Sequence, residues 1–529
     1  MSTGFNSLPA ILDHRLGLNA TELSESPYLD FRLYKMDLSS LLYFKGMEDV
    51  RYIEFPNETM SDEEGYLALS ELIAKFKCRL QIKLVLLPFD SPGIAERIRT
   101  LENVIILHLS DLQRITSHRN VTQPLREVFR QLDTHSLIGY QYQGAVTGNR
   151  FVGRETQINT LMQHPDVSYL VTGPRMSGKS SLLLETLRRL EANSPRDSGM
   201  PTNKIYVDCK SFANFAGLIN AILLKMEERT SFSRLERWQS PQVWPSFYNF
   251  LGSFVRNQLD KHLYIFLDEY DQVLDMEKRE GAKITWNFRR LRQENLEEKE
   301  KKFIQFVFAG SRELAAKATQ NASDLYNFVV DCKLRNFPMD PISQLLQRPM
   351  EELGFKISDP ALITQELLGE SSGRPSSVQF ICYHLASNML KANKSTITVS
   401  DLREVVQGSE YSHFYDLILH ENTDVLQRFI LSAQSRHDER RTTFSKDDIL
   451  RQLKNRGVFL DTAKLIHGLD DLVNSGFLEL EEHSAGEQKY VLSAPIIKRL
   501  FGRLALDDFV NLMVNQGIAF RLEGGGSKR

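Results

Sequence analysis

The sequence has few cysteines and no long apolar run. Four cysteines stand singly in 529 residues, with no C-x-x-C pair and no accompanying histidine cluster. This pattern argues against a disulfide framework or a zinc site and predicts reduced, mostly buried thiols in a cytosolic protein. No stretch of about 18 or more apolar residues occurs, so no transmembrane span is expected. The first residues lack the basic and apolar regions of a signal peptide, which also predicts a cytoplasmic location.

A strong charge of either sign is missing as well. The chain has 65 basic and 68 acidic residues, a net charge of −3, and 42% hydrophobic residues. This balance gives no whole-protein reason to expect nucleic acid or an anionic membrane as a partner, so any nucleic-acid role depends on a local patch. We find no internal repeat with a period of about 20–50 residues. The length predicts about three or four domains.

One stretch carries the clearest chemistry. Tyr169–Leu183 reads YLVTGPRMSGKSSLL, an apolar strand that runs into a glycine-containing turn and then an apolar-periodic helix. The turn fills every fixed position of the pattern G-x-x-x-x-G-K-[ST] in the strand–turn–helix context which that motif requires. The candidate nucleotide-binding residues of this P-loop are Gly173, Pro174, Arg175, Met176, Ser177, Gly178, Lys179, Ser180 and Ser181.

The residue types of the P-loop explain how it would hold phosphate. Gly173 and Gly178 let backbone N–H groups turn around phosphate oxygens without a Cβ in the way. Lys179 would bring a positive charge to the β- and γ-phosphates, and Ser180 would offer its hydroxyl to Mg²⁺. The dipole of the following helix would add to the attraction. The sequence therefore predicts ATP and Mg²⁺ as cofactors.

A second motif lies downstream. Leu263–Glu269 reads LYIFLDE, five apolar residues followed by two acids, which is typical of a central strand of a parallel sheet covered on both faces. The acids fall at the carboxyl end of the strand, where α/β sheets bind ligands. The stretch matches a Walker B motif. It predicts that Asp268 holds Mg²⁺ through water and that Glu269 polarises the attacking water.

The next expected strand, Phe303–Ala309, is followed by Gly310, Ser311 and Arg312. A polar group at this position can contact the γ-phosphate or the attacking water. Ser311 and Arg312 therefore join Lys179 and Glu269 as candidate catalytic residues.

The first 145 residues alternate between strands and helices. The expected strands are Arg51–Phe55, Ile82–Pro88 and Val104–Leu109. This order resembles the second half of a restriction-endonuclease-like fold. The acid-x-Lys of that family would fall at Glu54–Pro56, where proline replaces the lysine. We therefore expect an inactive, nuclease-like domain that recognises or docks a partner.

The segment from about Thr423 to Leu500 has the pattern of a winged helix, with three helices and a hairpin. Its third helix, Asp461–Asn474, has three aspartates and no arginine that could read guanine, which argues against recognition of bases in the major groove. Basic residues earlier in the segment leave room for non-specific contact with a DNA backbone. We expect an element that clamps the nucleotide domain.

From Phe151 to about Leu500 the chain resembles the STAND branch, including the NB-ARC type, of the AAA+-related P-loop ATPases. Two short motifs add to the Walker motifs: the FVGRE phrase Phe151–Glu155 and the sequence Gly373–Pro375. The resemblance implies that Arg312 reads the γ-phosphate and that the base lies against the FVGRE phrase. The further candidate cofactor-binding residues implied by these motifs are Val152, Gly153, Arg154, Arg374 and Pro375.

We therefore predict an α/β fold, in which a P-loop NTPase parallel sheet with a helical lid is joined to a winged helix and an N-terminal α/β domain. The expected boundaries are 1–145 for the N-terminal domain, 150–338 for the ATPase domain, 339–420 for the lid, 421–500 for the winged helix and 501–529 for a C-terminal tail.

Two functions remain open from the sequence. The first is a slow, regulatory ATPase of the STAND type that controls a separately encoded protein partner or effector, forms a homo-oligomer with ATP, and belongs to a bacterial antiviral defence system. The alternative is an AAA+ DNA-associated loader or transposition regulator that works as a ring or filament. A ring needs an arginine finger, and no arginine occurs between Glu313 and Leu334. A nuclease regulated by the ATPase is disfavoured by Pro56.

Overall fold

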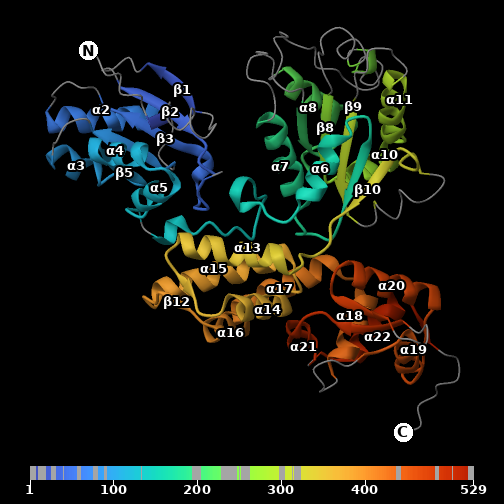
Figure 1. The fold of residues 1–529 in the computed structure, drawn as a ribbon. Helices are drawn as coiled ribbons and strands as arrows, with labels where there is room; N and C mark the ends of the chain where they lie inside the picture. The colour runs from blue at the N-terminus through green and yellow to red at the C-terminus, as the bar shows by residue number, and fades with distance from the viewer. Residues whose placement is uncertain are drawn as a thin grey trace.

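The computed structural model shows an N-terminal domain, a nucleotide domain, a helical lid beneath both, and a C-terminal domain beside the lid (Figure 1). The structure describes residues 8–9, 20–25, 31–39, 41–55, 61–75, 81–87, 92–132, 134–192, 204–227, 247–249, 251, 263–296, 304–311, 314, 323–436, 443–482, 488–502 and 504–521.

The nucleotide domain is built on a five-stranded sheet in the order β10-β6-β9-β8-β7, and all of its neighbouring strands run parallel. Every residue of β6, β8 and β9 is buried, which explains their continuous apolar sequences. The strands are β6 (Ser168–Thr172), β7 (Lys204–Asp208), β8 (Leu263–Asp268), β9 (Ile304–Gly310) and β10 (Val329–Lys333).

Helices cover both faces of this sheet. One apolar layer joins the sheet to α6 and α7, and a second joins it to α8, α10 and α11. These helices are α6 (Glu155–Gln163), α7 (Lys179–Ala192), α8 (Phe215–Glu227), α10 (Asp271–Glu280) and α11 (Ile284–Leu296). The predicted α/β fold class, with a doubly covered parallel sheet, is confirmed.

The lid consists of five helices and a pair of two-residue parallel strands. Its elements are α13 (Met339–Glu352), β11 (Lys356–Ile357), α14 (Pro360–Ser371), α15 (Pro375–Lys391), β12 (Thr396–Ile397), α16 (Val399–Gln407) and α17 (Ser409–Asn422). Proline at the first position of α14 and of α15 suits a helix start, because the missing N–H has no partner within the helix there.

The C-terminal domain has the three helices and the hairpin of a winged helix. Ser445 and Asp448 form a capping box at the start of α19. The elements are α18 (Val425–Ser435), α19 (Lys446–Lys454), β13 (Val458–Phe459), α20 (Thr462–Asn474), β14 (Leu478–Glu482), β15 (Gln488–Leu492), α21 (Pro495–Phe501), α22 (Leu506–Asn515) and β16 (Phe520–Arg521).

Within the expected C-terminal tail of residues 501–529, the structure has two regular elements, α22 and β16. The helix α22 buries Leu506, Val510 and Met513 in the apolar core it shares with α18, and β16 pairs with β13. Apolar side chains at helical spacing in residues 506–513 give the physical reason, because one face of this segment is covered by the winged helix.

The N-terminal domain is a five-stranded sheet in the order β1-β2-β3-β4-β5, with helices on both faces. The first three strands are antiparallel neighbours, and β3, β4 and β5 run parallel. Its elements are β1 (Ala20–Glu25), β2 (Arg32–Met36), β3 (Val50–Glu54), α2 (Asp62–Lys75), β4 (Lys83–Leu87), α3 (Pro92–Ile98), β5 (Val104–His108), α4 (Leu109–Ser117) and α5 (Thr122–Phe129).

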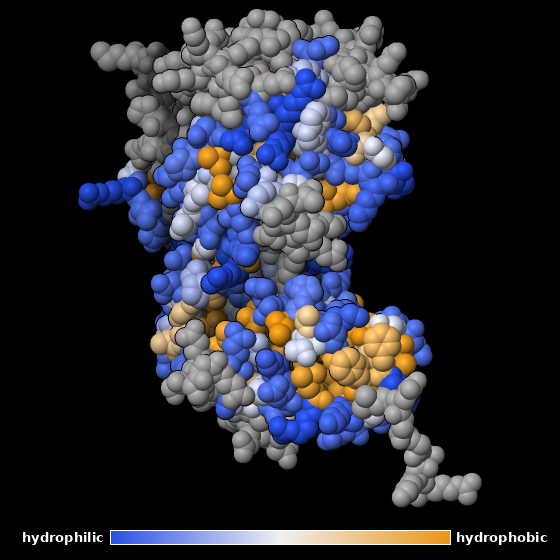
Figure 2. Space-filling view, turned by 90° about the vertical axis from the view of Figure 1, so that its right-hand side faces the viewer, coloured by the Kyte–Doolittle hydropathy of each residue, from blue (hydrophilic) through white to orange (hydrophobic). Residues whose placement is uncertain are grey.

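Most of the surface in Figure 2 is hydrophilic, and apolar residues gather on its lower part. The exposed apolar side chains of the C-terminal domain include Phe459 and Phe520, which face each other across β13 and β16. Within the described part of the chain, no helix combines the length and the hydropathy needed to cross a membrane.

Candidate functional site

The P-loop connects β6 to α7 at the carboxyl edge of the sheet. Because β6 lies between β9 and β10 while the chain continues to the distant strand β7, the strand order changes direction here, which is where open α/β sheets bind ligands. A Cβ at Gly173 would lie 2.8 Å from the Ser177 hydroxyl and 3.1 Å from the backbone oxygen of Leu334. Gly178 has a φ of +93°. Both glycines are therefore required by the turn.

A cleft of about 850 Å³ opens at this edge. Four parts of the chain line it: the P-loop and strand ends of the nucleotide domain, the linker before α6, the lid, and the start of the winged helix. The predicted residues on its wall are Val152, Arg154, Gly173, Pro174, Arg175, Met176, Ser177, Gly178, Lys179, Ser180, Ser181, Glu269, Ser311 and Pro375. The volume suits a nucleotide-sized ligand.

Lys179 points back over the P-loop. Its ammonium donates to the backbone oxygens of Gly173, at 3.0 Å, and Pro174, at 2.9 Å. Burial lowers the pKa of Lys179, and the carboxylates of Glu269 and Asp268 act in the opposite direction. A phosphate in the loop would stabilise the same charged form.

The two Walker B acids have different environments. Asp268 is buried and accepts hydrogen bonds from the Tyr206 hydroxyl and from the backbone N–H of Glu269, both at 2.9 Å. Glu269 is partly exposed on the cleft, 3.5 Å from the ammonium of Lys210. It has a φ of +52°, a left-handed conformation that is uncommon outside glycine and that clusters at functional sites. The end of β8 thus holds Asp268 in a fixed position and exposes Glu269 to the cleft.

Ser311 is held by an acid that sequence reasoning missed. Its backbone N–H and its hydroxyl both donate to the carboxylate of Asp271 at 2.7 Å. A Cβ at Gly310 would lie 2.5 Å from the same carboxylate, so glycine is needed for this approach. Asp271 stands at the start of α10. The only sequence feature that could have pointed to its role is its position three residues after Asp268. Arg312 lies outside the described residues, and its assigned role stays a prediction.

Gly153 and Arg154 join the nucleotide domain to the lid. Arg154 is buried and donates to the backbone oxygen of Arg335 at 2.6 Å, with its guanidinium 4.6 Å from the centre of the Phe337 ring. Burial lowers the pKa of Arg154 to about 10. Gly153 has a φ of +77° and lies against Pro341. These two residues therefore position the Val152 segment at the cleft.

The prediction that Arg374 contacts nucleotide does not fit the structure. Its side chain is fully buried between the lid and the winged helix. It donates to the backbone oxygen of Ser475 at 2.5 Å and lies 4.6 Å from the centre of the Phe477 ring. A buried guanidinium needs such partners, and the winged helix supplies them. Pro375, the next residue, lines the cleft, and its contact with nucleotide stays a prediction.

The end of the lid helix α17, just before the winged helix, contacts the P-loop, and the sequence could not predict this contact. The side-chain oxygen of Asn422 accepts the backbone N–H of Arg175 at 2.9 Å. We call this contact the Asn422 latch. Behind it, the residues of the winged helix and its approach that line the cleft are Glu421, Thr423, Asp424, Gln427 and Asp471.

The donor set fits the predicted Mg²⁺ ion. Ser180 offers a hydroxyl on the cleft and Asp268 a carboxylate at the adjoining strand end, both oxygen ligands of the kind that Mg²⁺ prefers. No cluster of three or more histidines, cysteines or acids suited to a metal occurs in the described part of the chain.

No protein-family model and no curated protein matches the sequence. Solved structures do match in fold. The ORC2 protein of Aeropyrum pernix, in ADPNP–ADP complexes, has a TM-score of 0.50 and 14% identity, over 71% of this chain and 98% of that one. Cdc6p of Pyrobaculum aerophilum has a TM-score of 0.36, 14% identity and the same coverages. A single-residue variant of RuvB from Thermotoga maritima has a TM-score of 0.35 and 13% identity, over 67% of this chain and 97% of that one.

The likeness to ORC2, together with the sheet order and the P-loop, defines the class. The chain has the fold of an AAA+ P-loop ATPase with a winged-helix domain.

Proposed function

We propose that this protein is an ATP-binding and ATP-hydrolysing switch in which nucleotide controls the position of the winged helix. The observation that carries the proposal is the Asn422 latch. The N–H of Arg175 is a P-loop donor of the kind that surrounds phosphate, and here it is donated to a residue at the entrance to the winged helix. Phosphate and Asn422, the last residue of the lid helix before the winged helix, therefore compete for one hydrogen-bond donor.

Charge supports the same competition. Asp424 and Asp471 of the winged helix line the cleft beside the P-loop, together with Glu269 and Asp271. ATP carries more negative charge than ADP, so the closed winged helix disfavours ATP more strongly. A ligand shifts a conformational equilibrium only through such a difference between states. ATP is expected to open the latch and ADP to tolerate it.

Within the cleft, the residues have separable tasks. Lys179 and the P-loop N–H groups bind the phosphates, and Ser180 and Asp268 would hold Mg²⁺, which would neutralise phosphate charge during hydrolysis. Glu269 orients the attacking water, and Lys210 positions the Glu269 carboxylate through their ion pair.

If Asn422 is a latch, Asn422→Ala should raise ATP affinity. One neutral hydrogen bond is worth roughly 0.5–1.5 kcal/mol, so we expect an increase of up to about tenfold. Titration calorimetry with a non-hydrolysable ATP analogue measures this change. His420→Ala, which removes an exposed side chain on the same helix, should leave the affinity at the parent value. Weaker ATP binding by Asn422→Ala would show that Asn422 supports the site and does not compete for it.

Two partners could be controlled by this switch. The exposed basic residues of α19 favour DNA, as in the AAA+ DNA-associated hypothesis, over a STAND-type switch that acts on a separate protein in antiviral defence. The STAND hypothesis is retained as a second candidate because the Asn422 latch ties the lid, at its junction with the winged helix, to the P-loop. An oligomer in the ATP state is compatible with both.

For DNA, we expect ATP-dependent, sequence-independent binding by the full chain. The exposed basic residues Arg451 and Lys454 on α19 can contact phosphates, whereas α20 and its N-cap expose Asp470 and Asp461. Replacing Arg451 and Lys454 by alanine should reduce the slope of log affinity against log salt by about 1 to 2. Fluorescence anisotropy with a labelled duplex measures this slope. If no duplex binds in any nucleotide state at low salt, DNA is rejected and the protein partner becomes the proposal.

A further inference from the structure

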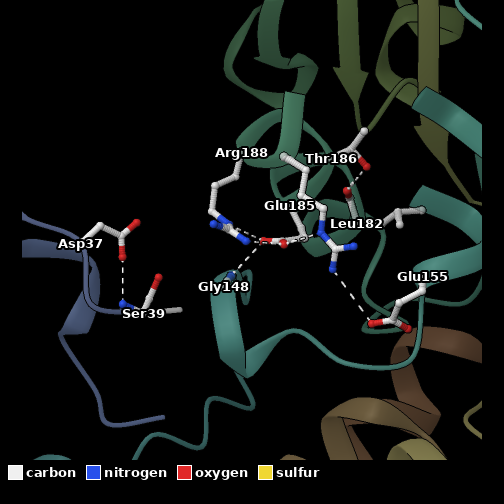
Figure 3. A network of polar contacts seen from close by, with 9 residues as sticks. Asp37, Ser39, Gly148, Glu155, Leu182, Glu185, Thr186 and Arg188 are labelled. Carbon is white, nitrogen blue, oxygen red and sulfur yellow. Dashed lines mark hydrogen bonds and ion pairs between the residues drawn. The ribbon is translucent and has the colours of Figure 1, made fainter. Parts of the chain in front are cut away.

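The linker between the N-terminal domain and α6 is fastened to the P-loop helix α7. The backbone N–H of Val146 donates to the hydroxyl of Ser181 at 3.0 Å, one residue beyond Ser180. Two residues later, the backbone N–H of Gly148 donates to the carboxylate of Glu185 at 2.9 Å, as Figure 3 shows. A connection that leaves the N-terminal domain therefore touches the helix that begins at the phosphate site.

Glu185 is suited to anchor this connection. Its side chain is fully buried on α7 and accepts hydrogen bonds from Arg188 and Arg189 at 2.8 Å, besides the one from Gly148 (Figure 3). Burial acts to raise the pKa of Glu185, but these hydrogen bonds lower it overall. The carboxylate is thus a buried anion whose partners come from both sides of the connection, and charged acceptors make the stronger hydrogen bonds.

The turn at residues 148–150 also contacts the N-terminal domain. The backbone N–H of Asn149 donates to the backbone oxygen of Ser39 at 2.8 Å, and Arg150 forms an ion pair with Glu48. Gly148 has a φ of +66°, and a Cβ there would lie 2.5 Å from the Ser39 hydroxyl. We call the contacts of residues 146–150 with α7 and with the N-terminal domain the core joint.

A second joint holds the N-terminal domain to the lid. Glu352, at the end of α13, is 1% exposed and accepts the backbone N–H of Tyr43 at 2.6 Å. Arg126 lies 3.6 Å from the Glu352 carboxylate, and Arg130 donates to its backbone oxygen at 3.0 Å. The Tyr140 hydroxyl adds a bond of 3.0 Å to a backbone oxygen of α13. These contacts are the lid joint.

The N-terminal domain thus bridges the two halves of the nucleotide cleft, the P-loop helix on one side and the lid on the other. We propose that the N-terminal domain is an allosteric regulator of nucleotide release, which keeps the lid and the linker closed over the cleft through the core joint and the lid joint. The proposal rests on the proposed ATP-binding function. Because coupling between two sites is reciprocal, nucleotide must also stabilise the joints.

The test breaks each joint from outside the nucleotide machinery. Gly148→Ala breaks the core joint through its clash with Ser39, and Gly517→Ala imposes the same backbone strain where a Cβ meets nothing within 4 Å. Arg126→Ala with Arg130→Ala breaks the lid joint from the N-terminal side. Its control is Arg348→Ala, which removes an Arg348–Glu352 pair internal to α13 and leaves the interdomain contacts in place.

Stopped-flow dissociation of a fluorescent ATP analogue from the full-length protein is the first measurement. We expect either joint variant to release the analogue about tenfold faster, which corresponds to the loss of about one charge-assisted contact. Breaking both joints should add little, since one broken joint already uncouples the domain. Both controls should keep the parent rate. The lid-joint variant preserves the test if Gly148→Ala does not fold.

Hydrogen exchange is the second measurement. Its expected result differs from that of a variant whose fold is only destabilised. A non-hydrolysable ATP analogue should slow amide exchange in residues 36–48 of the parent protein and not in the joint variants. If the parent binds the analogue but both variants release it at the parent rate, the N-terminal domain is a passive attachment and the proposal fails. If the parent binds no ATP analogue, the proposed function fails and this proposal fails with it.

Discussion

Lys179→Ala is expected to abolish detectable ATP binding. In the proposed function, the ammonium of Lys179 contacts the β- and γ-phosphates, and no other lysine lies in the P-loop. A hydrogen bond to a charged group is worth roughly 1.5–3 kcal/mol, and Lys179 would make two or more with phosphate. The combined loss corresponds to at least about a hundredfold in affinity. Titration calorimetry with ATP in the presence of Mg²⁺ measures the change.

The matched comparison is Lys210→Ala, which removes a second lysine that lines the same cleft but pairs with Glu269. This variant should bind ATP within a few-fold of the parent, because its charge supports catalysis and not the phosphate contact. Both variants should melt as cooperatively as the parent, which excludes unfolding as the cause. ATP affinity that survives Lys179→Ala would remove the P-loop assignment, and with it the proposed switch.

The nucleotide site could be predicted because its chemistry is local in sequence. The P-loop and the Walker B strand each fit within about seven to fifteen consecutive residues, and the strand–turn–helix pattern that positions them is encoded in the same stretch. Asp271 is near in sequence to Asp268, yet its bond to Ser311 depends on β8 and β9 being neighbours in the sheet. Sequence periodicity indicates strands and does not give their order.

Contacts between domains could not be predicted for the same reason. Asn422 lies 247 positions from its partner Arg175, and no spacing rule connects them. Arg374 is a candidate cofactor-binding residue from its sequence motif, but its guanidinium donates to the backbone oxygen of Ser475, 101 positions away. In both cases the identity of the residue permits several partners, and tertiary packing selects one.

The N-terminal domain shows where local patterns mislead. The strands β1 and β2 were not expected, because their alternation of polar and apolar residues is short and irregular, and a register shift interrupts their pairing. Residues 109–129 form two helices, α4 and α5, and the break lies just before Pro124, which fits only the first turn of a helix. The resemblance to a nuclease fold stays a prediction.

Glu269→Gln is expected to keep ATP binding and to lose turnover. Glutamine has nearly the same size and can still pack at the end of β8, but it cannot take the proton of the attacking water. Removing a positioned general base lowers rates by about 100- to 10,000-fold. Affinity should rise slightly, because one negative charge near the phosphates is removed. Phosphate release under single-turnover conditions, together with calorimetry, separates the two effects.

The left-handed conformation of Glu269 sharpens this test. With a φ of +52°, the residue carries backbone strain that a purely structural acid would not need, and Lys210 holds its carboxylate over the cleft. Asp275→Asn alters another acid on the cleft wall. It should change turnover only a few-fold, because Asp275 lies about one helical turn beyond Asp271, the first residue of α10. Equal losses in the two variants would mean that general electrostatics, and not a base at Glu269, limits hydrolysis. Turnover by Glu269→Gln at the parent rate would transfer the role of water positioning to another group, with the Asp271–Ser311 pair as the next to replace.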